Sequence, residues 1–117
     1  MAKFDQVEYN SSTETVDVGA GCLWDHVYIE LEKYERCVVG GARMGEVGVA
    51  GYLLGGGYSI KTNQFGLGID NIVKFQVILP DGRIVETEEK HPQYGDLFVA
   101  LKVRLYLLSP SCRDMIH

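Results

Sequence analysis

The sequence predicts an α+β fold in which a mixed or antiparallel sheet carries flanking helices. Three observations support this class. Apolar and polar residues alternate over residues 7–9 and 16–20, as in strands with one buried face. Apolar residues recur with helical spacing over residues 23–34. Farther along, two alternating runs flank the turn signal Pro80-Asp81-Gly82.

The first half of the chain predicts two short strands and one helix. The polar stretch 10–14 separates the two alternating runs, so we expect an antiparallel pair joined by a turn. The helical pattern predicts an amphipathic helix over residues 23–35, with Trp24 anchoring it to the sheet and with Tyr28 and Tyr34 in the core. The apolar run Cys37–Val39 is interpreted as a third short strand.

The second half predicts a hairpin followed by a helix. Val73–Leu79 and Arg83–Thr87 are the two arms of the hairpin around the Pro-Asp-Gly turn. Asp96 is a suitable N-cap for a helix that extends to Lys102. From residue 103 to residue 117 no periodicity is present.

Composition excludes several classes of protein. The chain has 117 residues, the length of one domain at most, and 46% of them are hydrophobic, which argues against disorder. With 11 basic and 16 acidic residues the net charge is −5, which disfavours nucleic acid as a partner. The sequence shows neither a membrane-spanning run nor a secretory signal, and the cellular compartment is left open. Three scattered cysteines and three scattered histidines predict neither a disulfide framework nor a metal site.

Glycine is concentrated in one segment. Ten of the 14 glycines fall between Gly40 and Gly68, among valines and leucines. Such a segment lets backbone N–H groups approach an anion or a flat ring, and a short helix beginning near Val49 would add its positive end. Tight packing of a helix on a sheet accounts for the same composition, and both readings stay open. The segment does not match the P-loop pattern, because no lysine follows its glycines. The Rossmann pattern nearly begins earlier, at Gly19-Ala-Gly21, but Trp24 occupies the position of its third glycine.

Four motifs in order give the sequence a family resemblance. They are Val18-Gly-Ala-Gly-Cys-Leu-Trp24, Val47-Gly-Val-Ala-Gly-Tyr-Leu-Leu-Gly-Gly-Gly-Tyr-Ser59, Asn63-Gln-Phe-Gly-Leu-Gly-Ile-Asp-Asn71 and Val77-Ile-Leu-Pro-Asp-Gly-Arg83. Together they resemble the FAD-binding, PCMH-type domain of the berberine-bridge-enzyme-like and vanillyl-alcohol-oxidase-type oxidoreductases. The resemblance covers about residues 4–102 and implies a partial domain over residues 1–102, with residues 103–117 as a divergent tail outside the family pattern.

The resemblance implies FAD as the cofactor, lying extended between two lobes. The glycine-rich segment would contact the diphosphate and the flavin side through backbone groups. The residues that match the family's motif, and are therefore expected to bind the cofactor, are Gly48, Val49, Gly51, Tyr52, Gly55, Gly56 and Gly57. Asp70 and Asn71 match the Asp-Asn pair of the family, and we interpret them as a turn that ends the loop.

Departures from the family pattern indicate a sequence truncated at both ends. The family's first phosphate-binding loop and flavin-linked histidine belong to a lobe that would precede Met1, and His26, His91 and His117 are expected to be surface or turn residues. The cysteine that links flavin in some members is replaced in the region of Arg43 and Met44. The substrate domain with its catalytic base is also missing, so no catalytic and no metal-binding residue is assigned.

The function implied is that of a fragment of an FAD-dependent oxidoreductase. The intact enzyme would transfer a hydride from a small-molecule substrate to the flavin and pass the electrons to dioxygen. We expect the isolated chain to be inactive, and turnover of an alcohol or a sugar by it would refute this. Two alternatives stay open: a non-catalytic binding module, or an inactive gene product that associates through an exposed sheet or the surface left by the missing lobes.

Overall fold

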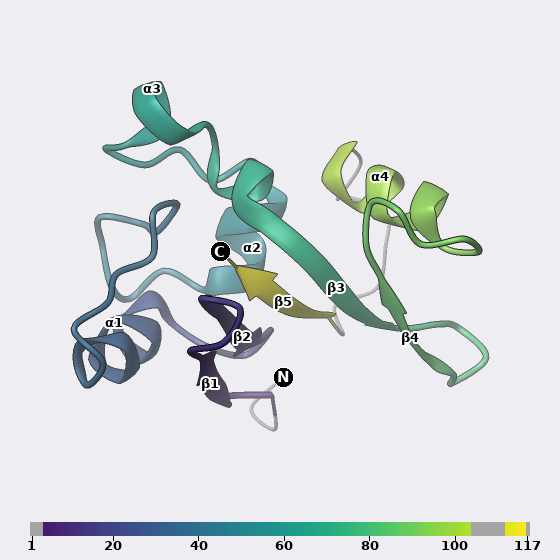
Figure 1. The fold of residues 1–117 in the computed structure, drawn as a ribbon, viewed down its shortest axis with the longest axis horizontal. Coiled ribbons are helices and arrows are strands. Elements are labelled where there is room, and N and C mark those ends of the chain that lie inside the picture. Colours follow the sequence, from purple (N-terminus) through teal and green to yellow (C-terminus); the bar gives the residue numbers. More distant parts are fainter. Residues whose placement is uncertain (1–3, 104–111, 117) are drawn as a thin grey trace.

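The computed structural model describes residues 4–103 and 112–116, and it has a five-stranded sheet with helices against one face (Figure 1). Every pair of neighbouring strands is antiparallel, and the strand order is β1-β2-β5-β3-β4. The elements in chain order are β1 (Val7–Asn10), β2 (Thr15–Gly19), α1 (Trp24–Glu32), α2 (Val49–Leu54), α3 (Thr62–Phe65), the 3₁₀ helix η1 (Gly68–Asn71), β3 (Ile72–Ile78), β4 (Ile84–Thr87), α4 (Gly95–Val103) and β5 (Cys112–Ile116).

The N-terminal strand pair is confirmed. β1 and β2 pair from Val7 opposite Val18 to Asn10 opposite Thr15. Glu14 turns the chain between them with a φ of 53°, which lies in the left-handed region that non-glycine residues rarely adopt. In β2, Val16 and Val18 are buried in the core.

Helix α1 is confirmed but is shorter than the sequence predicts. It buries Trp24, Val27 and Leu31, whose spacing of three and four residues places them on one face. The helix ends at Glu32, and Glu35 has a φ of 53°, so the helical stripe is interrupted before residue 35. The prediction that Tyr34 lies in the core is therefore wrong: its side chain is 49% exposed, and its ring lies 5.0 Å from that of Tyr9.

The hairpin of β3 and β4 forms as predicted, with Ile78 opposite Ile84. Asp81 and Gly82 account for the turn. Gly82 has a φ of 88°, which glycine adopts without a steric penalty. The Asp81 carboxylate accepts hydrogen bonds from the backbone N–H of Arg83 at 3.0 Å and from its Nε at 2.6 Å, and these bonds lower the pKa of Asp81.

Helix α4 closes the core over the hairpin. It begins at Gly95, one residue before the predicted N-cap, and it buries Phe98 and Leu101. The ring of Phe98 lies 5.5 Å from that of Phe75, which is fully buried at the centre of β3. The hydroxyl of the buried Thr87 donates to the carbonyl of Tyr94 and so ties the end of β4 to the start of α4.

Strand β5 lies at the centre of the sheet. It pairs with β2, where Val18 is opposite Asp114, and with β3, where Phe75 is opposite the same residue. Sequence periodicity indicated no regular element after residue 103, so this strand was missed. The short tail segment 112–116 thus joins the strand pair β1–β2 to the hairpin β3–β4.

The predicted strand at Cys37–Val39 is wrong. The segment is not hydrogen-bonded into the sheet and runs past the helical side of the fold. Val38 is buried in the hydrophobic core, and the carbonyl of Val39 accepts a bond from the Ser59 hydroxyl at 3.3 Å. A run of three apolar residues does not distinguish a short strand from a loop that packs on the core.

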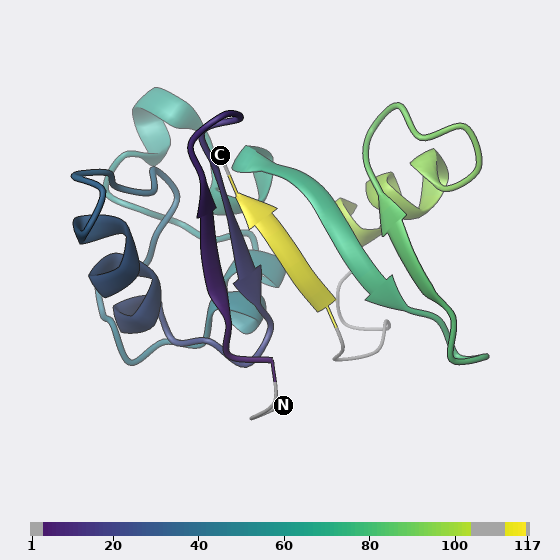
Figure 2. The same cartoon turned by 60° about the horizontal axis from the view of Figure 1, so that its bottom comes forward.

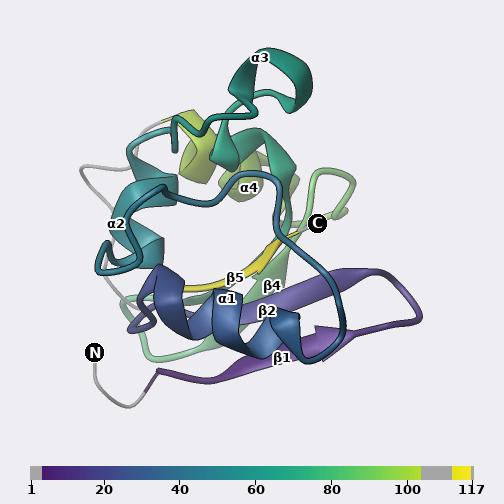
Figure 3. The ribbon, with the colours of Figure 1, turned by 90° about the vertical axis from the view of Figure 1, so that its left-hand side faces the viewer.

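The two faces of the sheet differ in character. Figures 2 and 3 show α1, α2 and α4 on one side of the strands, where Val18 and Phe75 are buried. On the opposite face Lys74 and Glu86 form an ion pair of 3.3 Å across β3 and β4. The helices and the functional elements described below therefore share one side of the molecule.

Removal of β5 should disrupt the fold. A chain that ends at residue 111 would leave β2 and β3 each with an unpaired edge at the middle of the sheet. We expect cooperative urea unfolding to be lost and the fluorescence of Trp24, the one tryptophan of the chain, to shift to that of an exposed indole. A chain that ends at residue 116 is the control. An unchanged urea midpoint for the shorter chain would contradict the central position of β5.

Candidate cofactor-binding site

Helix α2 has a buried face made of side chains and an outer face made of glycine. The helix begins at Val49, as predicted, and Val49, Ala50 and Leu53 are buried. On its other side Gly51 is exposed, as are Gly48 and Gly55, which cap the two ends of the helix. Their spacing of three and four residues places them along one stripe of the helix surface. We call these three residues the bare face of α2.

Several neighbouring glycines are required by the packing of the chain. Gly40, Gly57 and Gly68 form a glycine junction, where three segments meet backbone to backbone. A Cβ on Gly68 would lie 2.8 Å from the carbonyl oxygen of Gly40, and one on Gly40 would lie 2.6 Å from the Cα of Gly68. The amide of Gly68 donates to the carbonyl of Gly57 at 2.7 Å. Gly56 and Gly57 also adopt φ values of 100° and 72°, which favour glycine.

The bare face differs from these packed positions. A Cβ built on Gly48 or on Gly51 meets no atom of the described residues within 4 Å. Glycine in a helix costs about 1 kcal/mol relative to alanine, and packing within the chain does not offset that cost here. The absence of side chains leaves the main chain of α2 accessible to a molecule outside this chain.

Two tyrosine hydroxyls hold the glycine-rich segments in place. Tyr28 of α1 donates to the carbonyl of Ala42, and Tyr52 of α2 donates to the carbonyl of Tyr58. The two rings pack on Trp24, with centroids 5.8 and 5.5 Å from its own. Burial, and secondarily Tyr52 and Asp25, raise the pKa of Tyr28 to about 12.

The loop after α3 is ordered by Asp70 and Asn71. The Asp70 carboxylate accepts a hydrogen bond from the amide of Leu67 at 2.9 Å. The Asn71 amide donates to the carbonyl of Leu67 at 2.9 Å and to that of Phe65 at 3.3 Å. The interpretation of this pair as a turn that ends the loop is confirmed.

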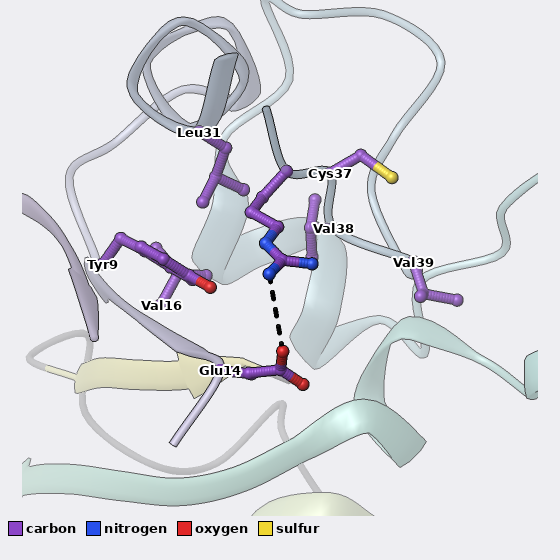
Figure 4. A pocket seen from close by; sticks show the side chains of 8 residues that line it. Tyr9, Glu14, Val16, Leu31, Cys37, Val38 and Val39 are labelled. Atoms are coloured by element: carbon purple, nitrogen blue, oxygen red, sulfur yellow. Dashed lines mark ion pairs between the residues drawn. The ribbon is translucent and has the colours of Figure 1, made fainter. Parts of the chain in front are cut away.

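Two pockets flank the segment Cys37–Val39, and sequence patterns gave no signal for either. The Tyr9 pocket has a volume of about 200 Å³, and Figure 4 shows its side chains gathered from the β1–β2 hairpin, α1 and the segment after it. At this pocket Arg36 pairs with Glu14 at 3.6 Å, the dashed line of Figure 4. The Arg43 pocket, about 220 Å³, lies between Tyr28, residues 37–43 and residues 59–61.

The two described histidines are a surface residue and a turn residue. His26 is exposed on α1. The Nδ1 of His91 accepts hydrogen bonds from the amides of Gln93 and Tyr94, so this residue belongs to a turn, as predicted. The prediction for His117 lies outside the described residues. Within residues 4–103 and 112–116 no cluster of metal-ligating side chains is present, and no helix there has the length and apolarity to cross a membrane.

Comparison with known proteins identifies the family. The family model described as FAD binding domain matches residues 1–88, three quarters of the chain. This chain belongs to the FAD-binding domain family. The resemblance of its four motifs is thereby confirmed, and FAD is the cofactor of the domain.

Relatives of this FAD-binding domain are considerably longer proteins. The FAD-dependent monooxygenase macF of Penicillium terrestre is 40% identical over 104 residues, which are 87% of this chain and 20% of the relative. The bifunctional solanapyrone synthase of Alternaria solani is 39% identical over 102 residues, 87% of this chain and 19% of the relative. The chain therefore spans about one fifth of the length of the curated relatives it matches.

Solved structures share the fold. The BBE-like 1 variant D396N of Physcomitrella patens is 27% identical with a TM-score of 0.87, over 99% of this chain and 25% of that protein. The glucooligosaccharide oxidase of Acremonium strictum is 25% identical with a TM-score of 0.87, over 100% of this chain and 24% of that protein. The α+β class, with an antiparallel sheet as a partial FAD-binding domain, is confirmed.

The expected cofactor residues of this FAD-binding domain occupy three kinds of position. Gly48, Gly51 and Gly55 are exposed on the bare face. Tyr52 and Gly56 are half-buried beside it, whereas Val49 is fully buried and Gly57 lies in the glycine junction. Residues 48–57 thus include positions with an exposed main chain and positions that are packed inside the fold.

The raised pKa of Tyr28 predicts a pH-dependent stability. The neutral phenol is favoured in the folded state, so its contribution is complete below the ordinary pKa of 10.0 and is lost as the pH rises toward about 12. In Tyr28→Phe the free energy of unfolding should fall by about 1 kcal/mol below pH 10, because the bond to Ala42 is lost. The advantage of the native chain should shrink between pH 10 and 12.

Urea unfolding across this pH range measures the effect, with Tyr34→Phe as the matched control, since Tyr34 is 49% exposed. A difference between the native chain and Tyr28→Phe that stays constant up to pH 12 would contradict the assignment.

Proposed function

We propose that this chain supplies one wall of the FAD site of a flavin-dependent oxidoreductase, and that the bare face of α2 is that wall. The observation that carries the proposal is the open space over Gly48 and Gly51, where a Cβ would meet nothing within 4 Å. Glycines that the chain does not need for its own packing are suited to close approach by a large, flat, phosphate-bearing ligand. The residues present therefore fit the cofactor that the family binds.

The seven expected cofactor residues fall into two groups, those that would contact FAD and those that hold the helix and its loop in place. Gly48, Gly51 and Gly55 present main-chain atoms to the diphosphate and the flavin side of FAD, because no side chain covers them. Val49 anchors the helix in the core. Tyr52 holds the following loop through the carbonyl of Tyr58. Gly56 and Gly57 turn the chain away from the helix through their positive φ values.

The activity of the intact enzyme is proposed from the flavin and from the relatives. FAD accepts a hydride from a substrate carbon when bound, and dioxygen is the proposed acceptor of the electrons. The relatives include proteins described as FAD-dependent monooxygenases and structures of oligosaccharide oxidases, which supports a small-molecule substrate. We assign no catalytic residue to this chain, and by itself it should not turn over an alcohol or a sugar.

Self-association of the isolated chain is a second part of the proposal. Large apolar side chains are exposed between α2 and α3, where Tyr58 is 70% and Ile60 is 79% exposed. Met44, which precedes α2 in the chain, and Phe65, the last residue of α3, are exposed as well. Apolar groups exposed this closely along a chain favour association with another surface. Sedimentation at rising protein concentration would detect it.

Blocking the bare face should abolish cofactor binding without harm to the fold. Gly51→Leu places a side chain in space that the chain leaves empty, and it replaces a poor helix former by a good one. We expect a free energy of unfolding that is unchanged or up to about 1 kcal/mol higher. FAD binding should fall at least tenfold, measured by quenching of flavin fluorescence and by the rise in melting temperature that FAD causes.

The control is Glu32→Leu, which adds the same side chain to an exposed position of α1. This variant should bind FAD as the native chain does. Undiminished FAD binding by a folded Gly51→Leu chain would refute the bare face as the cofactor wall. A native chain that folds but neither quenches flavin fluorescence nor gains melting temperature with FAD would favour the reading as a binding module for another ligand.

A further inference from the structure

The Arg43 pocket has walls from three separate segments. Tyr28 of α1 lies on one side, residues 37–43 on a second and residues 59–61 on a third. Its volume of about 220 Å³ is below the range of about 300–1,000 Å³ that is typical of sites for drug-sized ligands. The pocket is therefore too small for a whole dinucleotide and suits a molecule of roughly one ring.

The charge of this pocket is positive and uncompensated. Arg43 and Lys61 line it from opposite segments, and none of its lining residues carries a carboxylate. Neither cation forms an ion pair with any described residue. In the neighbouring Tyr9 pocket, by contrast, Arg36 is matched by Glu14 at 3.6 Å. In a chain of net charge −5, two unmatched cations at one pocket favour an anion there.

Hydrogen bonds fix the walls that carry these cations. The buried Ser59 donates through its hydroxyl to Val39 at 3.3 Å, which joins the second and third walls. The amide of Lys61 donates to the Ser59 hydroxyl at 3.2 Å, and the Ser59 amide donates to the Thr62 hydroxyl at 2.8 Å. The backbone of Lys61 is thus held in a tight turn.

The remaining lining is apolar and partly open to solvent. Val38 is buried, Val39 is half-buried and Ile60 is 79% exposed at the rim. On the opposite wall a Cβ on Gly41 would come within 3.0 Å of the Tyr28 ring, so the glycine there is needed for that ring to pack. A ligand with an apolar body would cover Val39 and Ile60 and remove their surface from water.

The geometry points to a binding site in the Arg43 pocket for a small carboxylate with an apolar body. Its carboxylate lies between Arg43 and Lys61, and its body lies against Val39 and Ile60. Arginine and lysine together suit a carboxylate, since guanidinium and ammonium groups both donate charge-assisted hydrogen bonds. None of the residues that line this pocket belongs to the bare face of α2, and the proposed site does not rest on the FAD proposal.

Benzoate and benzyl alcohol are matched probes of this site, because they share a ring and differ in charge. Calorimetric titration of the native chain should give benzoate an affinity at least tenfold above that of benzyl alcohol. The double variant Arg43→Gln/Lys61→Gln should lower benzoate affinity at least tenfold, so that benzoate and benzyl alcohol bind with similar affinity. High salt should weaken benzoate binding and leave that of benzyl alcohol unchanged.

Lys33→Gln is the control for loss of a cation away from the pocket, because Lys33 lies on α1 and pairs with Glu30 at 2.6 Å. It should bind benzoate as the native chain does. Equal affinities for the two probes, or a double variant that keeps its benzoate affinity, would overturn the proposal. Competition by FAD would also overturn it, since the pocket would then belong to the cofactor. Gly51→Leu should still bind benzoate, so that the test of the Arg43 pocket is independent of the test of the bare face as the FAD site.

Discussion

The glycine-rich half of the molecule depends on the approach of three backbones at Gly40, Gly57 and Gly68. No Cβ can be accommodated between Gly40 and Gly68, where the nearest backbone atoms would lie 2.6 and 2.8 Å away. The bond from Gly68 to Gly57 joins the loop after α2 to η1, and a further bond from Ile69 to Gly56 extends that contact. Because these segments are locked together, the exit of α2 and the walls of the Arg43 pocket have fixed positions.

Much of this architecture could be predicted from local sequence patterns. The β1–β2 pair, α1, the β3–β4 hairpin and α4 each carry their own signal, in alternation, helical spacing or turn residues. Elements whose structure depends on distant partners gave no such signal. Segment 112–116 is a strand because β2 and β3 leave a place between them, whereas Cys37–Val39 packs as a loop on the helical side of the sheet.

Sequence patterns predicted where along the chain the candidate site lies, but not which of its glycines are open to a ligand. The density of glycine marked residues 40–68, yet composition did not separate glycines that pack from glycines that face solvent. Only the packing of the folded chain distinguishes Gly68, where a Cβ would clash with the backbone of Gly40, from Gly51, around which there is space. The pairing of Arg36 with Glu14, and the lack of an ion-pair partner for Arg43 among the described residues, likewise depend on how segments far apart in sequence are placed.

The position of β5 also has a consequence for the order of folding. Val16 pairs with Ile116, one hundred residues later in the chain, and β3 pairs with the same strand. During synthesis, β2 and β3 would therefore both emerge from the ribosome well before the strand that joins them. Such long-range pairing slows folding and leaves strand edges open to other chains in the meantime. Until residues 112–116 are made, the β1–β2 pair and the β3–β4 hairpin are two separate units with no strand between them.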